Sequence, residues 1–252
     1  MSTLCVDVGN THTVVGVFEE ETLVQTWRLT TPAAITSDEV LLKMQSLLQM
    51  ENIFPQRINH VGLSSVVPDL ERIWIKALSV FLNKEVKVLS HNNCLGLELD
   101  YDRPEQIGPD RLANVLALKH MGYENALAVD LGTATTFDLL HQGAFAGGVI
   151  FPGISSSMEA LTTKAKRLTP VSLLWPAQVI GKNTEDSIRS GLLHGFMGQL
   201  QHIVDGMKKE IDQESLFVIG TGGWSSVLED NGLFDAFDNF LTLKGIRLIA
   251  IH

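Results

Sequence analysis

The chain has 252 residues, which suffices for one large domain or for two of roughly 100 to 150 residues each. Its composition, 45% hydrophobic and 19% charged, is close to the globular average and excludes a largely disordered protein. The 19 basic and 29 acidic residues give a formal net charge of −10, and an acidic protein repels nucleic acid and anionic lipid. We therefore expect neither nucleic acid nor a membrane as a partner.

The cysteine count and the N-terminal residues indicate the cellular compartment. Cys5 and Cys94 are too few for a disulfide framework, and no CxxC pair suggests a zinc site. The first residues lack the basic region and the uninterrupted apolar run of a signal peptide. No stretch of 18 apolar residues is present to span a membrane. We expect a reducing, cytoplasmic environment.

A short pattern occurs twice along the chain. Residues 4–18 read LCVDVGNTHTVVGVF and residues 127–141 read LAVDLGTATTFDLLH, with an offset of 123 residues that is close to half of the length. Each copy is typical of a buried strand, a tight glycine turn and a second strand, which together form a β-hairpin in a mixed sheet. A chance match between two ordinary hairpins is the alternative.

The residues between and after the two copies alternate between helical and extended patterns, so both halves are expected to be α/β. Ser37 is a plausible N-cap of the first helix, and the Gly- and Pro-containing segment 147–153 is expected to be a loop. The spacing of apolar residues predicts helices over 37–50, 70–82, 109–121, 155–167 and 186–211, and strands over 60–67, 85–89 and 216–220.

The turn of the first copy is the leading candidate for chemistry, because the common nucleotide, hydrolase and zinc motifs are absent from the sequence. Gly9 allows a ligand to approach the backbone closely, and Asn10 and Thr11 add polar groups. Asp7, at the end of the strand, is suited to hold hydrated Mg²⁺, which needs only one or two carboxylates. Such a turn suits a polyphosphate. A plain hairpin with an Asx turn is the alternative.

A second candidate is the sequence Gly108-Pro109-Asp110-Arg111 at the start of a predicted helix. The free N–H groups and the positive end of the helix dipole favour anions at this position. Arg111 can bind a carboxylate or a phosphate through two hydrogen bonds, and Asp110 can accept a hydroxyl proton. An acidic residue that merely stabilises the helix is the alternative. Residues 220–223, Gly-Thr-Gly-Gly, follow a strand and fit either a nucleotide edge or a simple turn.

The long predicted helix carries three glycines on one face. Gly191, Gly195 and Gly198 lie at i, i+4 and i+7, which allows another helix to approach closely. We expect a homodimer joined through this face, and packing within the chain is the alternative.

Taken together, these segments resemble the type III pantothenate kinases over nearly the whole chain. The resemblance rests on DVGNT near the N-terminus, Tyr101 ahead of GPDR, DLGTATTFD, GGVIFPGI, KNTEDSIRSG and GTGG, in this order and spacing. It implies a duplicated ribonuclease H-like fold of the sugar kinase, Hsp70 and actin superfamily, with mixed sheets flanked by helices. We place the domains at 1–115 and 116–252, and the family resemblance implies a site in the cleft and a homodimer.

The resemblance also implies roles for individual residues. Asp110 would be the general base, Asp130 would bind a monovalent cation, K⁺ or NH₄⁺, and Asp7 would lie near Mg²⁺. Pro109 departs from the small residue that the family usually has there, but proline suits the first position of a helix. The ATP contacts would be Asp7, Val8, Gly9, Asn10, Thr11, His12, Thr13, Val14 and Thr133. The pantothenate contacts would be Tyr101, Gly108, Pro109, Asp110, Arg111 and Thr184.

The implied reaction is the ATP-dependent phosphorylation of pantothenate on its 4′-hydroxyl, the first step of coenzyme A biosynthesis. This agrees with the residues, since phosphoryl transfer depends on positioning and charge neutralisation rather than on covalent catalysis. A catalytically degenerate regulatory protein of the same family is the alternative. An actin-like or Hsp70-like mechanical ATPase is less suitable, because 252 residues leave no room for an added substrate domain.

Overall fold

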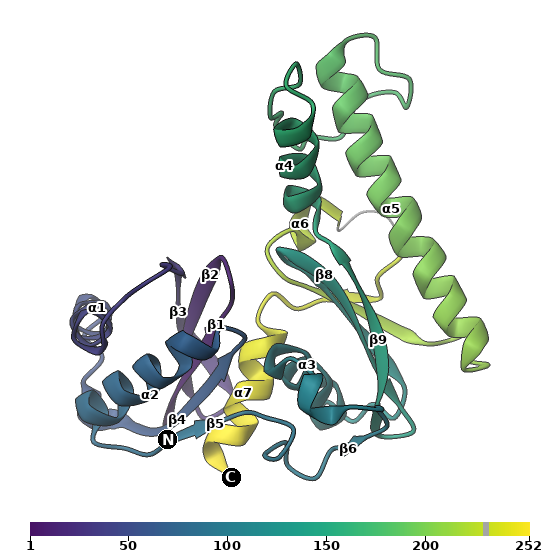
Figure 1. Ribbon diagram of the computed structural model, residues 1–252. Helices are drawn as coiled ribbons and strands as arrows, with labels where there is room; N and C mark the ends of the chain where they lie inside the picture. Colours follow the sequence, from purple (N-terminus) through teal and green to yellow (C-terminus); the bar gives the residue numbers. More distant parts are fainter. Residues whose placement is uncertain (229–231) are drawn as a thin grey trace. The chain divides into compact units, whose positions relative to one another are not determined.

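Each half of the chain begins with the strand–turn–strand unit that the sequence repeat predicts (Figure 1). The computed structural model describes residues 1–228 and 232–252. The strands are β1 (Ser2–Val8), β2 (His12–Glu19), β3 (Thr22–Thr30), β4 (Ile58–Ser65), β5 (Val86–Val88), β6 (Glu98–Leu99), β7 (Ala126–Leu131), β8 (Ala134–His141), β9 (Ala144–Pro152), β10 (Phe217–Thr221) and β11 (Ala236–Phe237). The helices are α1 (Ser37–Met50), α2 (Pro68–Leu82), α3 (Pro109–His120), α4 (Ile154–Lys164), α5 (Thr184–Glu210), α6 (Ser225–Leu228) and α7 (Leu241–Ile251), with short 3₁₀ turns η1 (Pro55–Arg57) and η2 (Pro104–Gln106).

The order of the strands confirms the duplication. The first sheet has the order β3-β2-β1-β4-β5, and the second has the order β11-β10-β7-β8-β9-β6. Apart from β6, the second order is the first one repeated, with β7 in the place of β1 and β10 in the place of β4. Because β1 pairs antiparallel with β2 and parallel with β4, the sheet is mixed, as the hairpin predicts. A chance match between two hairpins does not explain this correspondence.

The chain divides into two compact units whose bounds differ from the expected halves 1–115 and 116–252. The first unit comprises residues 1–124, 140–146 and 240–252, and the second comprises 125–139 and 147–239. The physical reason is that α7, at the end of the chain, packs on β1 and β4 and against α3, and so completes the core of the first unit. A boundary at 115/116 would also cut α3.

The two faces of the first sheet have different partners, and this alternation places the side chain of Asp7. Leu4, Val6 and Val8 belong to the apolar core that α1 and α2 cover. Strand residues alternate between faces, so Asp7 lies on the other face. On that face the sheet approaches α7, where Ile246 comes close to Gly62.

Two local expectations were wrong. The N-cap of α1 is Thr36 rather than Ser37, because the Thr36 side chain accepts the N–H of Glu39 while the Glu39 carboxylate accepts the N–H of Thr36. The segment 147–153 is mostly strand β9 and not a loop, because sheet pairing outweighs its Gly and Pro content. Among the described residues, no helix combines the length and the apolar character needed to cross a membrane.

Candidate active site

Asp7 stands near the carboxyl end of β1, where the parallel strand β4 brings Ser64 beside it. The Ser64 hydroxyl is fully buried and donates a hydrogen bond of 2.9 Å to Oδ1 of Asp7. This bond holds one carboxylate oxygen and leaves the other available. The sequence analysis did not identify Ser64, which follows an apolar run and becomes part of the site only through the pairing of β1 with β4.

The turn between β1 and β2 is closed by its own backbone. The N–H of Gly9 donates to the carbonyl of His12 over 3.0 Å, and the carbonyl of Thr11 accepts the N–H of Thr31 over 2.9 Å. Residues 10–12 are exposed, whereas Val8 and Thr13 are buried strand residues that pair with each other. The part of the turn that can receive a ligand is therefore Gly9 to His12, and its neighbours hold it in place.

Asp110 lies in the first turn of α3, the position that the sequence predicts. Pro109 occupies the first turn, and the Oδ1 atom of Asp110 accepts the N–H of Arg111 over 2.9 Å. A Cβ atom on Gly108 would lie 2.4 Å from that same oxygen. Glycine at 108 thus gives the Asp110 carboxylate the space it occupies.

The negative charge of Asp110 acts on Asp7. The Asp7 residue keeps some solvent exposure, but its carboxyl group is surrounded by protein. The pKa of Asp7 is raised from 3.8 to about 7. Burial is the largest cause, the negative charge of Asp110 also raises it, and the Ser64 hydrogen bond opposes both. Two carboxylates that repel each other in this way form a site that a cation would stabilise.

Two predicted substrate residues of the first unit meet on one aromatic ring. The guanidinium of Arg111 lies over the ring of Phe145, 5.4 Å from its centre, and Tyr101 contacts the same ring edge-on at 5.8 Å. Phe145 is fully buried at the start of β9 and was not predicted as a site residue. It fixes Arg111 and Tyr101 near the start of α3, where Asp110 lies.

The second unit carries Asp130 at the position that corresponds to Asp7. Asp130 pairs with Thr221 of the parallel strand β10. Gly222 has φ +91, and a Cβ atom on it would lie 2.4 Å from Oδ1 of Asp130. The Thr221 hydroxyl is buried and has no hydrogen-bond partner in the described part of the chain. An acidic group and an unsatisfied hydroxyl thus occur on adjacent strands.

Thr133 and Thr184 also belong to the second unit. The carbonyl of Thr133 accepts the N–H of Gly153 over 3.0 Å and the hydroxyl of Ser156 over 2.6 Å, so the start of α4 holds this turn. Thr184 is the first residue of α5, after the N-cap Asn183. It lines a mainly apolar cavity of about 320 Å³ together with Leu161, Leu168, Ser187, Ile188, Gly191 and Leu192.

The duplicated mixed sheets, with an acidic residue near the end of the first strand in each unit, have the fold of the sugar kinase, Hsp70 and actin superfamily. Among solved structures, the ROK hexokinase of Thermus thermophilus is similar, with a TM-score of 0.55 at 14% identity, over 100% of this chain and 99% of that chain. Such low identity shows the fold alone.

The sequence narrows the class to one family. The family model described as type III pantothenate kinase matches residues 3–206. A type III pantothenate kinase of Halalkalibacterium halodurans is 39% identical over 98% of this chain and 97% of its own length. One of Kosmotoga olearia is 38% identical over 98% of this chain and 95% of its own length. The chain belongs to the type III pantothenate kinase family.

The raised pKa of Asp7 makes a prediction about stability. The unfolded carboxyl titrates near 3.8 and the folded one near 7, so the folded state loses stability as pH rises between these values. The loss of folding stability caused by ionised Asp7 is absent below about pH 3.8 and complete above about pH 7. Asp7→Asn removes it and should stabilise the metal-free protein at pH 8 by on the order of 2 kcal/mol, allowing for solvent screening.

Thermal denaturation at pH 4.5 and pH 8 without divalent ions measures this effect. The gain in melting temperature on Asp7→Asn should be clearly larger at pH 8. Asp212→Asn serves as the control, because Asp212 is exposed and its left-handed backbone (φ 53) tolerates asparagine. An equal gain at both pH values, or a loss at pH 8, would contradict the assignment.

Proposed function

We propose that this protein phosphorylates pantothenate with ATP on its 4′-hydroxyl, the reaction that opens coenzyme A biosynthesis. The single observation that carries the proposal is the placement of Asp7 and Asp110, from a strand end and a helix start, within electrostatic reach of each other. One acidic group for the cation and a second for the acceptor hydroxyl are what phosphoryl transfer to an alcohol needs. Membership of the pantothenate kinase family selects the substrate.

In this proposal Asp110 takes the proton from the pantothenate hydroxyl as that oxygen attacks the terminal phosphorus of ATP. The N–H of Arg111 donates to Oδ1 of Asp110 and holds the carboxylate that would accept the proton. Because Gly108 has no Cβ atom, the Asp110 carboxylate has room for this position. The positive end of α3 stabilises the ionised form that a base requires.

Asp7 fits a role next to Mg²⁺, because its carboxyl is held beside a second negative charge that a cation would neutralise. The described residues contain no cluster of three or more His, Cys, Asp and Glu side chains for a metal. Mg²⁺ does not need one, since it keeps several waters and binds through one or two carboxylates and the phosphates. When bound, the ion would neutralise phosphate charge, and Ser64 would orient the Asp7 oxygen toward it.

The remaining contacts follow the same logic. The exposed turn 9–12 would receive the ATP phosphates through its backbone and hydroxyl groups, and Thr133 would contact ATP as well. Arg111 and Tyr101, fixed on Phe145, would bind the carboxylate and hydroxyl groups of pantothenate. Thr184 would contact pantothenate as well. Both cysteines are buried and unpaired, which fits the cytoplasmic location that we propose.

The assignment of the base is tested by Asp110→Asn. The variant should fold and bind ATP, because asparagine is nearly the same size, but its turnover should fall by roughly 10²–10⁴-fold. Turnover is measured in a coupled assay for ADP with and without pantothenate, and nucleotide binding by calorimetry. Turnover within a few-fold of the parent protein would show that the base lies elsewhere.

We also propose that Asp130 binds a monovalent cation. The buried Thr221 hydroxyl, which has no hydrogen-bond partner among the described residues, supports this, because its oxygen could coordinate a cation. Gly222 supports it too, since its missing side chain lets the backbone approach the Asp130 carboxylate. K⁺ and NH₄⁺ suit a site with a single charge and neutral oxygens.

Exchange of Na⁺ for K⁺ at constant ionic strength tests the cation site. Activity should rise several-fold in K⁺, and Asp130→Asn should remove most of the difference. Thr221→Val, which keeps the shape but lacks the hydroxyl, should weaken the response in the same direction. A parent protein that is insensitive to the exchange would refute the cation role and leave the kinase proposal intact.

A homodimer joined through α5 completes the proposal. Apart from the adjacent residues and nearby backbone of α5 itself, no described atom lies within 4 Å of a Cβ atom placed on Gly191, Gly195 or Gly198. Packing within the chain therefore does not account for these glycines. The apolar cavity beside Thr184 reaches Gly191 and Leu192 on the same helix. A second copy that packs on this face across a two-fold axis would cover both the glycines and the cavity.

Gly195→Leu is the variant that tests the dimer. The bulky side chain should separate the two helices, shift the mass in light scattering toward 27.7 kDa and weaken pantothenate binding. Gln45→Leu, at an exposed position of α1 in the first unit, is the control and should change neither. A parent protein that is monomeric at assay concentration would contradict the proposal.

The regulatory alternative receives no specific support. A degenerate protein is expected to lose charged groups of the reaction, whereas Asp7, Asp110 and Asp130 are all present at strand ends and a helix start. We therefore keep the kinase as the single proposed function.

A further inference from the structure

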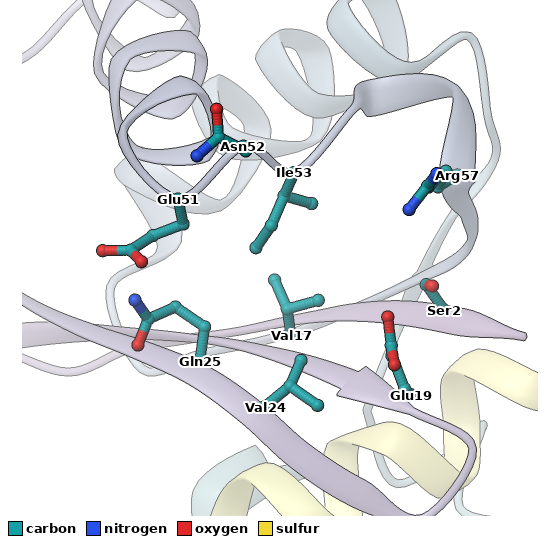
Figure 2. A pocket seen from close by; sticks show the side chains of 9 residues that line it. All are labelled: Ser2, Val17, Glu19, Val24, Gln25, Glu51, Asn52, Ile53 and Arg57. Atoms are coloured by element: carbon teal, nitrogen blue, oxygen red, sulfur yellow. The ribbon is translucent and has the colours of Figure 1, made fainter.

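A second cavity lies in the first unit, at the end of the sheet remote from Asp7. It has a volume of about 290 Å³ and lies between β1–β3 and the turn after α1 (Figure 2). Ser2, at the start of β1, lines it, whereas Asp7 lies five residues further along the same strand. At about 3.3 Å per residue the two sites are some 17 Å apart along the strand. The cavity is thus distinct from the proposed active site.

Two β-bulges border this cavity, and both lie at this end of the sheet. In the pairing of β2 with β3, Val17 faces Gln25 and Phe18 faces Leu23, so Val24 is the extra residue of a bulge. Consecutive strand residues normally point to opposite faces, but Val24 and Gln25 both line the cavity. Bulges are common beside binding sites because they redirect a side chain in this way.

The second bulge fixes the start of β1. Ser2 faces Ile58 and Thr3 faces His60, so Asn59 is the extra residue. Its side-chain oxygen accepts the N–H of Ser2 over 3.0 Å. This bond anchors the edge of the cavity that Ser2 provides.

The opposite wall is also held by its backbone. The N–H of Ile53 donates to the carbonyl of Leu48 over 2.8 Å, and Asn52 has the left-handed conformation, with φ 56, that closes the helix. Glu51, Asn52 and Ile53 are therefore presented on an ordered turn. Because both walls are fixed, the cavity does not depend on a mobile segment.

The lining combines opposite charges with an apolar centre. Figure 2 shows Arg57 and Glu19 at one end, Glu51 and Gln25 at the other, and Ile53 and Val17 between them. The Arg57 guanidinium lies over the Phe54 ring at 5.6 Å, and neither it nor the Glu19 carboxylate forms an ion pair or hydrogen bond among the described residues. A cation and an anion are thus available at one end of the cavity, and the partly exposed side chains of Val24 and Ile53 supply its aliphatic contacts.

From this arrangement we propose that the cavity binds an α-amino acid with an aliphatic side chain. Arg57 would bind the carboxylate, and Glu19 would bind the ammonium group. The side chain would lie on Val24 and Ile53, and its end would point toward Gln25 and Glu51. The volume of about 290 Å³ corresponds to roughly ten water molecules, which leaves room for an amino acid as large as leucine. This inference is independent of the proposed kinase reaction.

Calorimetric titration of the full-length protein with L-leucine and L-valine tests the proposal. Analogues that lack one group separate the interactions: 4-methylpentanoate lacks the ammonium of leucine, isopentylamine lacks its carboxylate, and glycine lacks the side chain. Each should bind at least about tenfold more weakly, because each lacks a charge-assisted contact or the apolar contact.

Matched variants locate the site. Arg57→Gln and Glu19→Gln should each weaken leucine binding about tenfold or more, since each removes one charged partner. Arg72→Gln, at an exposed arginine of α2, should leave it unchanged. Pantothenate kinase activity should persist in all three, which shows that they are folded. The proposal is overturned if neither amino acid binds at about 20 mM, if 4-methylpentanoate binds as well as leucine, or if Arg57→Gln binds as the parent does.

Discussion

The carboxylate of Asp7, enclosed by protein beside the charge of Asp110, is the interaction on which the rest of the account depends. Desolvation and the like charge both raise the free energy of the ionised group, and the pKa of Asp7 rises to about 7. The Ser64 hydrogen bond lowers this cost but does not remove it. Two neighbouring carboxylates without a cation destabilise the folded state, and the cation that accompanies a phosphate substrate would neutralise their charge.

Elementary features of the sheet create this pair. The alternation of β1 sends Leu4, Val6 and Val8 into the core under α1 and α2, so Asp7 must lie on the face that α7 covers. The parallel neighbour β4 then supplies Ser64, and α3, packed against β4 and α7, supplies Asp110 at its N-terminus. The same strand order recurs in the second unit, where Asp130 and Thr221 take the places of Asp7 and Ser64.

Much of this could be predicted from the sequence, because the signals are local. The two hairpins, the mixed sheets and the helix that begins at Pro109 all follow from periodicity and turn chemistry within a few residues. The family motifs then identified Asp7, Asp110 and Asp130. Their roles in catalysis and cation binding remain proposals.

The features that escaped prediction depend on pairing between distant segments. Ser64 and Phe145 acquire their importance from neighbours 57 and 34 residues away in the chain, Asp7 and Arg111. The return of α7 to the first sheet, which moves the boundary of the first unit, has no local signal either. The Gly and Pro content of residues 147–153 predicted a loop, but hydrogen bonds to neighbouring strands make most of this segment part of strand β9.

The most direct test of the central claim is an NMR titration of the Asp7 carboxyl carbon in metal-free protein labelled at aspartate, with Asp7→Asn used to assign the signal. The account predicts a pKa near 7 in the parent protein and a lower pKa in Asp110→Asn, because removal of the neighbouring charge stabilises the ionised form. A pKa near 4 that does not respond to the substitution at Asp110 would show that the two carboxylates do not share a site, and would contradict the account.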